Sequence, residues 1–237
     1  MYEGTEAEIY DLVNEGRGKD YAGESRLVID LIRTHRPDAA SLLDVACGTG
    51  LHLGHFRTEF DRVAGLELSA DMLDIARRRL PDVPFHLGDM RDFDLGDAKF
   101  DAVTCMFSSI GHMADVSELR AAMTCLARHT VPGGVAVIEP WWFPEAYHPG
   151  VAADVARTER RSVARVSHSS WHEGNTRMEV HYLVADADGG AHHFVETSIV
   201  SLFTRREYET AFDEASWTPT YVAGGPTGRG LFVGIRR

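Results

Sequence analysis

Between residues 42 and 140, short apolar runs alternate with segments that carry apolar residues at helical spacing. Short runs bounded by turn residues are typical of buried β-strands, and the intervening periodicity is typical of amphipathic helices. Strands that alternate with helices form a parallel sheet with right-handed crossovers. The pattern therefore predicts an α/β sheet whose first five strands lie at residues 42–46, 62–67, 83–87, 100–107 and 135–139.

Capping residues mark where two helices of this sheet begin. Ser69 suits the N-cap of the helix after the second strand. Residues 115–118 predict a capping box before the helix that follows the fourth strand. The Pro-Gly-Gly sequence at 132–134 is expected to stop that helix before the fifth strand begins.

After Trp141 the pattern changes to extended segments with turns at 173–175 and 188–190, which predict an antiparallel meander over 158–203. A capping box at 204–207 opens a last helix, and two closing strands follow. The predicted plan is an α/β sheet with a β-rich antiparallel insertion between strand five and the last helix. The expected divisions are residues 1–142, 143–203 and 204–237, with closing strands at 218–222 and 231–236.

The N-terminal segment carries two further helical patterns. Ile9, Leu12 and Val13 share one side of a short helix, and a longer helix follows a polar loop at residues 14–21. This segment either covers a ligand cleft or simply caps the sheet, and the pattern leaves both readings open.

Composition narrows the class of protein. The 237 residues are 44% hydrophobic, which is enough for one sizeable core, or for one domain with a substantial insertion. No apolar run reaches the roughly 18 residues that a membrane helix needs. The N-terminus lacks the pattern of a signal peptide, so we expect a cytoplasmic protein. Three cysteines without a CxxC pair are expected to be small buried residues rather than a disulfide framework.

A formal net charge of −12 disfavours nucleic acid as a partner, although a local positive pocket can still hold a small anion. The twelve histidines raise the question of a metal site. His52 and His55 lie one helical turn apart, and His192 and His193 are adjacent, but neither pair has a convincing third ligand. We therefore expect no metal.

A glycine-rich turn follows the first strand at residues 44–50. It lets the backbone approach a ligand and presents helix N-terminal N–H groups. A dinucleotide site prefers G-x-G-x-x-G, and here Gly48 and Gly50 fit while Leu53 occupies the third glycine position. This departure disfavours a pyrophosphate ligand and favours one anchored by a carboxylate.

Two acidic residues follow the next two strands. Glu67 ends the second strand, where a carboxylate can accept both hydroxyls of a ribose. Asp89 follows the third strand and can accept from an adenine amino group, with Met90 packing on the ring. Because the carboxyl ends of consecutive parallel strands meet at one edge, these residues predict an adenosine site beside the turn.

This combination resembles the class I S-adenosylmethionine-dependent methyltransferases over residues 40–140 and the last two strands. Ala46 replaces the first glycine of their motif, which should leave the turn intact. The resemblance implies S-adenosylmethionine as cofactor and a Rossmann-like sheet. It implies a donor site built from Ala46, Gly48, Glu67, Asp89, Met90 and Met106, completed by Tyr10 and Lys19. An aromatic ring suits a sulfonium, and a lysine suits the methionyl carboxylate.

Three loops at the carboxyl edge of the sheet are candidates for acceptor binding: residues 108–113, 139–145 and 224–230. The last contains Arg229 among glycines, which predicts either an anion site or a tight turn with a solvent-facing arginine.

The chain also resembles the N,N-dimethyltransferases that act on nucleotide-linked amino sugars in macrolide antibiotic biosynthesis. The matching stretches include residues 2–21, 104–112, 139–144 and 224–232. The resemblance implies that a TDP-3-amino-3,4,6-trideoxyhexose is methylated twice at the 3-amino nitrogen, the last step of TDP-desosamine formation, with a TDP-mycaminose-type acceptor as the alternative. It implies that Tyr2, Tyr21, His112 and Arg229 lie near the sugar or diphosphate, and that the nucleotide end contacts Trp142, Arg165, Ser169, Ser170 and Tyr182.

An amine must lose a proton before it accepts a methyl group, because simple alkylamines are protonated at neutral pH. His112 is the first candidate for a general base and Tyr21 the second, although positioning the sugar is the role we favour for His112. Rival readings are a methyltransferase of oxygen or nitrogen on another small natural product, a non-catalytic adenosylmethionine-binding module, and a nicotinamide oxidoreductase that Leu53 disfavours. The insertion can pair between subunits, so we expect a homodimer.

Overall fold

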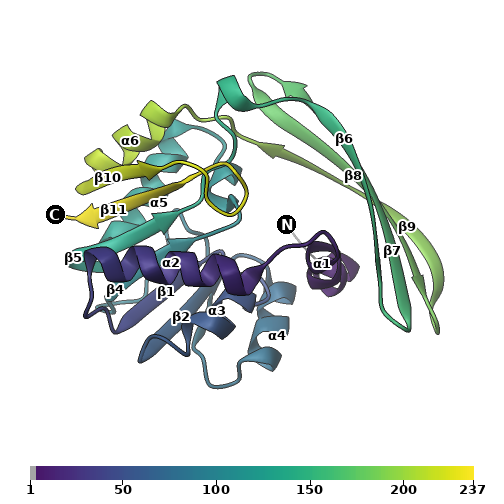
Figure 1. Ribbon diagram of the computed structural model, residues 1–237, viewed down its shortest axis with the longest axis horizontal. Helices are drawn as coiled ribbons and strands as arrows, with labels where there is room; N and C mark the ends of the chain where they lie inside the picture. Colours follow the sequence, from purple (N-terminus) through teal and green to yellow (C-terminus); the bar gives the residue numbers. More distant parts are fainter. Residues whose placement is uncertain (1–3) are drawn as a thin grey trace.

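The computed structural model describes residues 4–237 and contains two sheets (Figure 1). The larger sheet has seven strands in the order β10-β11-β5-β4-β1-β2-β3. Its first five strands in sequence run parallel, while β11 is antiparallel to β5 and β10 is antiparallel to β11. The strands are β1 (Ser41–Val45), β2 (Arg62–Glu67), β3 (Phe85–Leu87), β4 (Phe100–Cys105), β5 (Thr130–Ile138), β10 (Trp217–Val222) and β11 (Leu231–Arg236).

Helices cover both faces of this sheet and bury two apolar clusters against it. On one face, α5 and α6 contribute side chains such as Leu119, Leu126 and Tyr208. On the other face, α2, α3 and α4 contribute Val28 and Phe56, among others. The alternating pattern predicted the parallel sheet with its helical crossovers, and the structure adds that these helices cover both faces. The helices are α2 (Tyr21–His35), α3 (Leu51–Phe56), α4 (Ala70–Arg79), α5 (Val116–Arg128) and α6 (Arg205–Glu214).

The caps of α4 and α6 are confirmed. The Ser69 hydroxyl accepts a hydrogen bond from the backbone N–H of Met72 at 3.2 Å. Thr204 and Glu207 form the reciprocal capping box of α6. At α5 the prediction was wrong in one detail. Asp115 caps the helix, but the Glu118 carboxylate accepts from the N–H of Ala114 rather than from that of Asp115.

The end of α5 also differs from the prediction. The helix ends at Arg128, and β5 already begins at Thr130, so the Pro-Gly-Gly sequence lies inside a strand. The register explains this. Thr130 pairs with Phe100 and Val135 pairs with Ala102, and the intervening residues of β5 form an irregularity that absorbs the proline and glycines.

The second sheet is antiparallel, in the order β6-β7-β8-β9, and lies between β5 and α6 in sequence. Its hairpin turns are confirmed. Glu173 and Gly174 both have positive φ, as the tight turn of a two-residue hairpin requires. Strand β6 was missed because its side chains are mostly small and exposed. The strands are β6 (Gly150–Arg157), β7 (Arg161–His172), β8 (Asn175–Asp186) and β9 (Gly190–Val200), and short 3-10 turns precede the sheet at η1 (Ser109–His112) and η2 (Pro144–Ala146).

The N-terminal segment divides between the two sheets. Helix α1 (Thr5–Gly16) packs Ile9 and Val13 against the second sheet, where Val163 and Val180 lie, whereas α2 packs on the first sheet. Figure 1 shows α1 between the parallel sheet and the long antiparallel arm. Helix α2 therefore caps the main sheet, as one reading of the sequence had it, whereas α1 packs on the antiparallel sheet.

All three cysteines are buried free thiols, as predicted. Within residues 4–237, no helix has both the length and the apolar character needed to cross a membrane. Over the same residues, no group of three histidine, cysteine or carboxylate side chains has a metal-binding arrangement.

Candidate active site

The turn between β1 and α3 leaves open space beside its backbone. Ala46, Gly48 and Gly50 all have positive φ, at 56°, 57° and 80°. This conformation costs an L-residue such as Ala46 roughly 1–2 kcal/mol, so the alanine is tolerated with some strain. A Cβ atom added to Gly48 meets no protein atom within 4 Å, so the space in front of this residue is free for a ligand.

Glu67 is fixed by this turn and by the start of the next loop. Its Oε2 accepts the N–H of Gly48 at 3.0 Å, and its Oε1 accepts the N–H groups of Leu68 and Ser69 at 2.9 Å each. Three backbone donors orient the carboxylate without using all its lone pairs, because an ionised carboxylate has about four acceptor sites. Glu67 can therefore still accept the hydroxyls of a ribose.

A cavity of about 380 Å³ opens at the carboxyl ends of β1, β2 and β3 and will be called the donor cavity. Its lining includes most of the residues that the sequence predicted for the donor, from three strand ends and from α1. These are Tyr10, Ala46, Gly48, Glu67, Asp89 and Met90.

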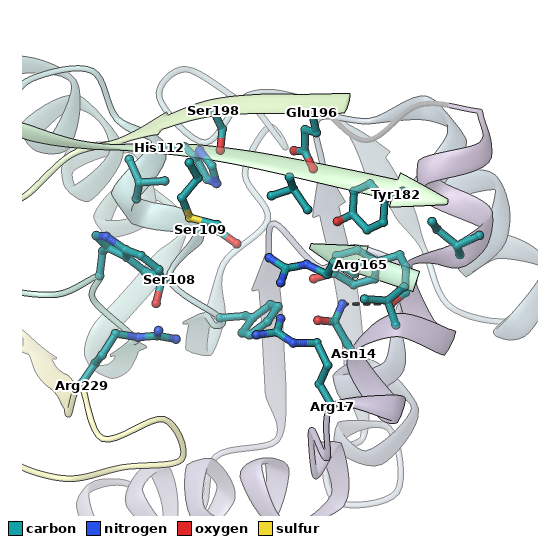
Figure 2. A pocket seen from close by; sticks show the side chains of 18 residues that line it. Asn14, Arg17, Ser108, Ser109, His112, Arg165, Tyr182, Glu196, Ser198 and Arg229 are labelled. Atoms are coloured by element: carbon teal, nitrogen blue, oxygen red, sulfur yellow. Dashed lines mark hydrogen bonds between the residues drawn. The ribbon is translucent and has the colours of Figure 1, made fainter. Parts of the chain in front are cut away.

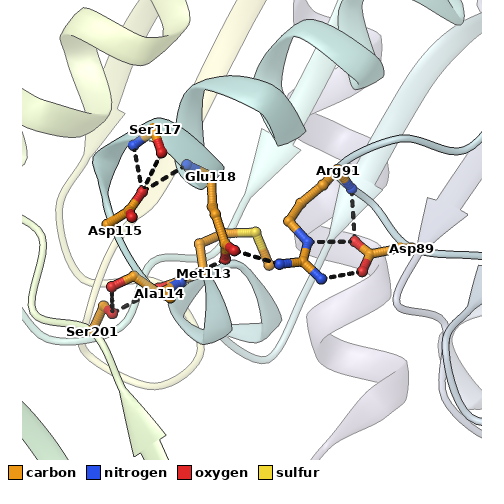
Figure 3. A network of polar contacts seen from close by, with 8 residues as sticks. All are labelled: Asp89, Arg91, Met113, Ala114, Asp115, Ser117, Glu118 and Ser201. Atoms are coloured by element: carbon orange, nitrogen blue, oxygen red, sulfur yellow. Dashed lines mark hydrogen bonds and ion pairs between the residues drawn. The ribbon is translucent and has the colours of Figure 1, made fainter.

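Asp89 is held by a neighbour that the sequence analysis did not consider. The guanidinium of Arg91 donates to Asp89 through Nε at 2.9 Å and also pairs with Glu118 (Figure 3). This hydrogen bond lowers the pKa of Asp89 below its ordinary value. Asp89 is thus an ionised acceptor at the rim of the donor cavity, in a form suited to an adenine amino group.

A smaller space of about 30 Å³ continues from the turn toward Met106 and the predicted contacts Tyr10 and Lys19. Here the structure adds an unexpected partner, because Lys19 Nζ lies 2.6 Å from Glu24 Oε2. The same carboxylate oxygen lies 2.8 Å from Nε2 of His52. The side chains of Lys19, Glu24 and His52 are only 6%, 7% and 8% exposed.

Burial opposes the ionisation of Glu24, but the hydrogen bonds from His52 and Lys19 outweigh it, so the pKa of Glu24 lies below its ordinary value. Lys19 also lies over the ring of Phe107, 3.8 Å from its centroid. The ammonium expected to bind the methionyl carboxylate is therefore already paired, and a ligand carboxylate would have to share it with Glu24.

A second cavity, of about 230 Å³, lies between α1, the inner face of the antiparallel sheet and the loops after β4 and β5 (Figure 2). It will be called the acceptor cavity. It brings together four of the residues that the sequence predicted for the acceptor, namely His112, Arg165, Tyr182 and Arg229.

Basic side chains gather at one side of the acceptor cavity. Arg229 lies 3.4 Å from the fully buried Glu139 and 4.7 Å from the ring centroid of Trp141, with its side chain 10% exposed. Arg17 and Arg165 share Asp154, at 3.0 Å and 3.4 Å. Arg229 is therefore buried in the site, and the alternative of a solvent-facing arginine is wrong.

The two candidate bases differ in their environment. Burial lowers the pKa of His112 below its usual 6.5, so its imidazole is neutral at pH 7 and able to accept a hydrogen bond or a proton. Burial, together with Asp11 and Glu24, raises the pKa of Tyr21 far above its ordinary value. Tyr21 keeps its proton and lies at the Lys19 end of the donor site rather than in the acceptor cavity, which argues against it as a base.

Some predicted acceptor residues lie elsewhere. Trp142 is outside the lining of the acceptor cavity, and the neighbouring Trp141 lines it instead, with Nε1 donating to Thr176 at 3.1 Å. Ser169 bonds to the backbone of Gly150 on the sheet, and neither Ser169 nor Ser170 lines the cavity. Tyr2 lies outside the described residues.

The acceptor cavity also contains residues that were not predicted from the sequence. Arg17, Ser109, Trp141, Glu196 and Ser198 line it. Ser109 and Trp141 were detectable in principle, because they belong to the candidate loops after the fourth and fifth strands. Glu196 is placed by the pairing of β9 with β8, where its cross-strand partner is Val180.

The sequence is similar to those of known methyltransferases. The family model described as a methyltransferase domain matches residues 42–134. The chain is 57% identical to the dTDP-3-amino-3,4,6-trideoxy-alpha-D-glucopyranose N,N-dimethyltransferase of Streptomyces venezuelae, over 99% of each protein. It is 50% identical to the dTDP-4-amino-2,3,4,6-tetradeoxy-D-glucose N,N-dimethyltransferase of Saccharopolyspora spinosa, over 100% of this chain and 94% of the relative.

The fold is also similar to those of solved methyltransferase structures. The crystal structure of DesVI from Streptomyces venezuelae matches with a TM-score of 0.94 and 55% identity, over 100% of both chains. The S-adenosylmethionine-bound structure of CalS10, an amino pentose methyltransferase from Micromonospora echinaspora, matches with a TM-score of 0.89 and 49% identity, over 100% of this chain and 98% of that one. The readings as a nicotinamide oxidoreductase and as a non-catalytic module are wrong. The chain belongs to the class I S-adenosylmethionine-dependent methyltransferases, among the N-methyltransferases of amino sugars.

Proposed function

We propose that this protein transfers two methyl groups to the 3-amino nitrogen of a dTDP-linked 3-amino-3,4,6-trideoxyhexose, the last step in forming a desosamine-type sugar for a macrolide antibiotic. A mycaminose-type acceptor, with a hydroxyl at C4, is the second candidate. The observation that carries the proposal is the adjoining pair of cavities. The donor cavity has an adenosine-type set of contacts, and the acceptor cavity combines arginines with a neutral histidine.

The arginine side of the acceptor cavity suits a nucleoside diphosphate. Guanidinium groups match phosphate oxygens in a bidentate geometry. Arg229 is rigidly placed by Glu139 and by Trp141, and Arg17 and Arg165 approach from α1 and β7. We assign Tyr182 and the wall of the antiparallel sheet to the nucleotide end, with residues 143–203 as the acceptor-binding module and Tyr2 kept as a proposed sugar contact.

S-adenosylmethionine, when bound, supplies a methyl group on a sulfonium sulfur. In each round the amine first loses a proton, its lone pair then forms the N–C bond, and the S–C bond breaks with its electrons on sulfur. A neutral amine and a sulfonium become an ammonium and a thioether, so positive charge moves and none is created. The residues here therefore contribute mainly by aligning the reactants, an effect worth up to roughly 7–11 kcal/mol for well-oriented groups.

His112 is the residue we assign to the sugar at the reacting end. It lines both cavities, and its neutral imidazole accepts a hydrogen bond from an ammonium or a hydroxyl. In this role it orients the nitrogen toward the donor cavity. The proton that leaves the amine can pass either to His112 or to water. Methyl transfer therefore does not require His112 as a base.

The acceptor is tested by steady-state kinetics with three dTDP sugars: a 3-amino-3,4,6-trideoxy, a 3-amino-3,6-dideoxy and a 4-amino-2,3,4,6-tetradeoxy sugar. We expect the highest kcat/KM for the 3-amino-3,4,6-trideoxy sugar, which is the proposed acceptor and lacks a C4 hydroxyl. A higher kcat/KM for the second would make the enzyme mycaminose-type. Preference for the 4-amino sugar would contradict the assignment of the 3-amino nitrogen.

We also propose that two chains pair through the outer face of the antiparallel sheet. This face exposes Val151, Val166, Leu183 and Val195, with Val151 81% exposed. These apolar side chains lie on one sheet face beside His181 and His193, and large exposed apolar groups of this kind are typical of interfaces. Sedimentation analysis should give a dimer for the native chain and a monomer for Leu183→Glu. A monomeric native chain at micromolar concentration would contradict the pairing.

A further inference from the structure

The donor and acceptor cavities meet at a boundary. Side chains from three separate parts of the chain form it. The residues that line both are Tyr10, Ser109, His112, Glu196 and Ser198. A reacting nitrogen has to lie at this boundary, because it must reach from the acceptor cavity to the donor. The boundary therefore decides which functional group can be methylated.

Glu196 is the one acidic residue in the lining of the acceptor cavity among the described residues. It projects from the inner face of β9, and Figure 2 shows its carboxylate pointing into the cavity, on the same side of it as Ser198 and Tyr182. Its cross-strand partner is Val180 of β8, which is buried on the same face. Since the strand is hydrogen-bonded within the sheet, the carboxylate is presented from a rigid element.

The acceptor cavity is consequently polarised. Arg17, Arg165 and Arg229 lie on one side of the cavity, and Glu196 lies at the boundary with the donor cavity. A ligand that fits this charge pattern carries an anion at one end and a cation at the other. A nucleotide diphosphate amino sugar has this character, because its amino group is protonated at neutral pH.

We propose that the carboxylate of Glu196 binds the acceptor's amino group as an ammonium and thereby selects amines over hydroxyls. This inference rests on the proposed function. The physical need for such a group is clear, because the sulfonium of the donor and the ammonium of the acceptor repel each other. A carboxylate beside both offsets that repulsion, and more strongly in a site of low dielectric than in water.

The same contact bears on the second methylation. The product of the first round is again an ammonium, so the Glu196 carboxylate holds it as it held the primary amine. Retention at the boundary gives the monomethyl species time to lose a proton and to meet a fresh donor. Loss of the carboxylate should therefore increase the fraction of monomethyl product that is released.

The proposal is tested by calorimetric binding in the presence of S-adenosylhomocysteine, which prevents turnover. The probes are dTDP-3-amino-3,6-dideoxyglucose and dTDP-6-deoxyglucose, which differ only in the amine or hydroxyl at C3. Glu196→Gln should weaken binding of the amine by roughly 30-fold or more, as expected when one partner of a desolvated ion pair is removed. Binding of the hydroxyl analogue should change by less than about threefold, since a neutral hydroxyl forms no ion pair with the carboxylate.

A pH series separates this role from a structural one. In the native protein, the preference for the amine should fade as pH rises above the pKa of the ammonium, whereas in Glu196→Gln it should be small throughout. Glu196→Asp should recover part of the preference. The matched control is Glu173→Gln, at the exposed turn between β7 and β8, which should leave both affinities unchanged.

Equal weakening of both ligands, or an unchanged preference for the amine, would overturn the role of Glu196. These outcomes are distinct from a failure of the proposed function. The proposed function fails if the native enzyme methylates no dTDP-amino sugar, whereas the role of Glu196 fails if the native enzyme methylates the amine and the variant keeps the native preference.

Discussion

The donor and acceptor cavities lie side by side but are built in different ways. The donor cavity is formed by backbone: a turn with three positive φ angles, the ends of three adjacent strands, and a carboxylate bonded to three N–H groups. The acceptor cavity is formed by side chains from α1, three loops and an antiparallel sheet. Local backbone geometry thus suffices to form the donor cavity, whereas the acceptor cavity requires side chains that only tertiary packing brings together.

The largest expected effect is the loss of donor affinity when Glu67 is removed. Glu67→Ala should weaken S-adenosylhomocysteine binding by roughly 100-fold or more, because the variant loses the charged acceptor for the ribose hydroxyls and frees the N–H of Gly48. Calorimetry measures the affinity. The control is Asp74→Ala on the exposed side of α4, which should bind normally. Unchanged affinity in Glu67→Ala would remove this residue from the donor site.

A smaller effect is expected on the acceptor side. Arg229→Ala should raise KM for the nucleotide sugar by roughly 30-fold, with donor affinity within about twofold of native, because it removes a guanidinium and leaves Glu139 buried without that partner. Steady-state kinetics and calorimetry measure the two quantities. Arg229→Lys keeps the charge without the planar fork and should lie between. Equal losses for donor and acceptor would mean that the two cavities are not separate.

His112→Asn should lower kcat by about tenfold without abolishing it, since Asn keeps a hydrogen-bonding group but cannot take a proton. The native rate should fall as pH drops through the pKa of His112, which burial places below 6.5, because protonation removes the neutral form. The variant should lack that acidic limb. Complete loss of activity at every pH would show that His112 is an essential base.

The smallest effect concerns the strain in the donor turn. Ala46→Gly should raise the free energy of unfolding by about 0.5–1 kcal/mol, because glycine adopts the φ of 56° without a steric cost. Thermal unfolding should show a rise of about 1–4 °C for a protein of this size. The same exchange at Ala121, exposed within α5, should instead destabilise by about 1 kcal/mol. A lower melting temperature for Ala46→Gly would mean that its methyl group packs usefully.

Predictions from the sequence were most successful for the donor cavity and for the order of the elements. Glu67 and Asp89 were found because strand ends in a parallel sheet lie at one edge, so position in the chain predicts position in space. The order of elements and most caps followed from local periodicity in the same way. Strand β6 was not predicted, because this edge strand has small, exposed side chains and lacks the apolar alternation typical of strands.

On the acceptor side, local patterns were less informative. Trp141 and Trp142 are indistinguishable in sequence, and only the path of the chain after β5 determines which one faces the cavity. Glu24 looked like an ordinary helix residue, yet folding places its carboxylate against Lys19 and His52. Such contacts join segments that no periodicity relates, and they become visible only once the sheets are packed.

One measurement tests the central claim most directly: that this pair of cavities joins a methyl donor to a sugar nitrogen twice. The acceptor is dTDP-3-amino-3,4,6-trideoxyglucose labelled with ¹⁵N at the amine, and the donor is S-adenosylmethionine labelled with ¹³C at the methyl group. Nuclear magnetic resonance should show two ¹³C methyl groups, each coupled to the same ¹⁵N. Labelled methyl groups without coupling to nitrogen, or no labelled methyl on the sugar, would contradict the account.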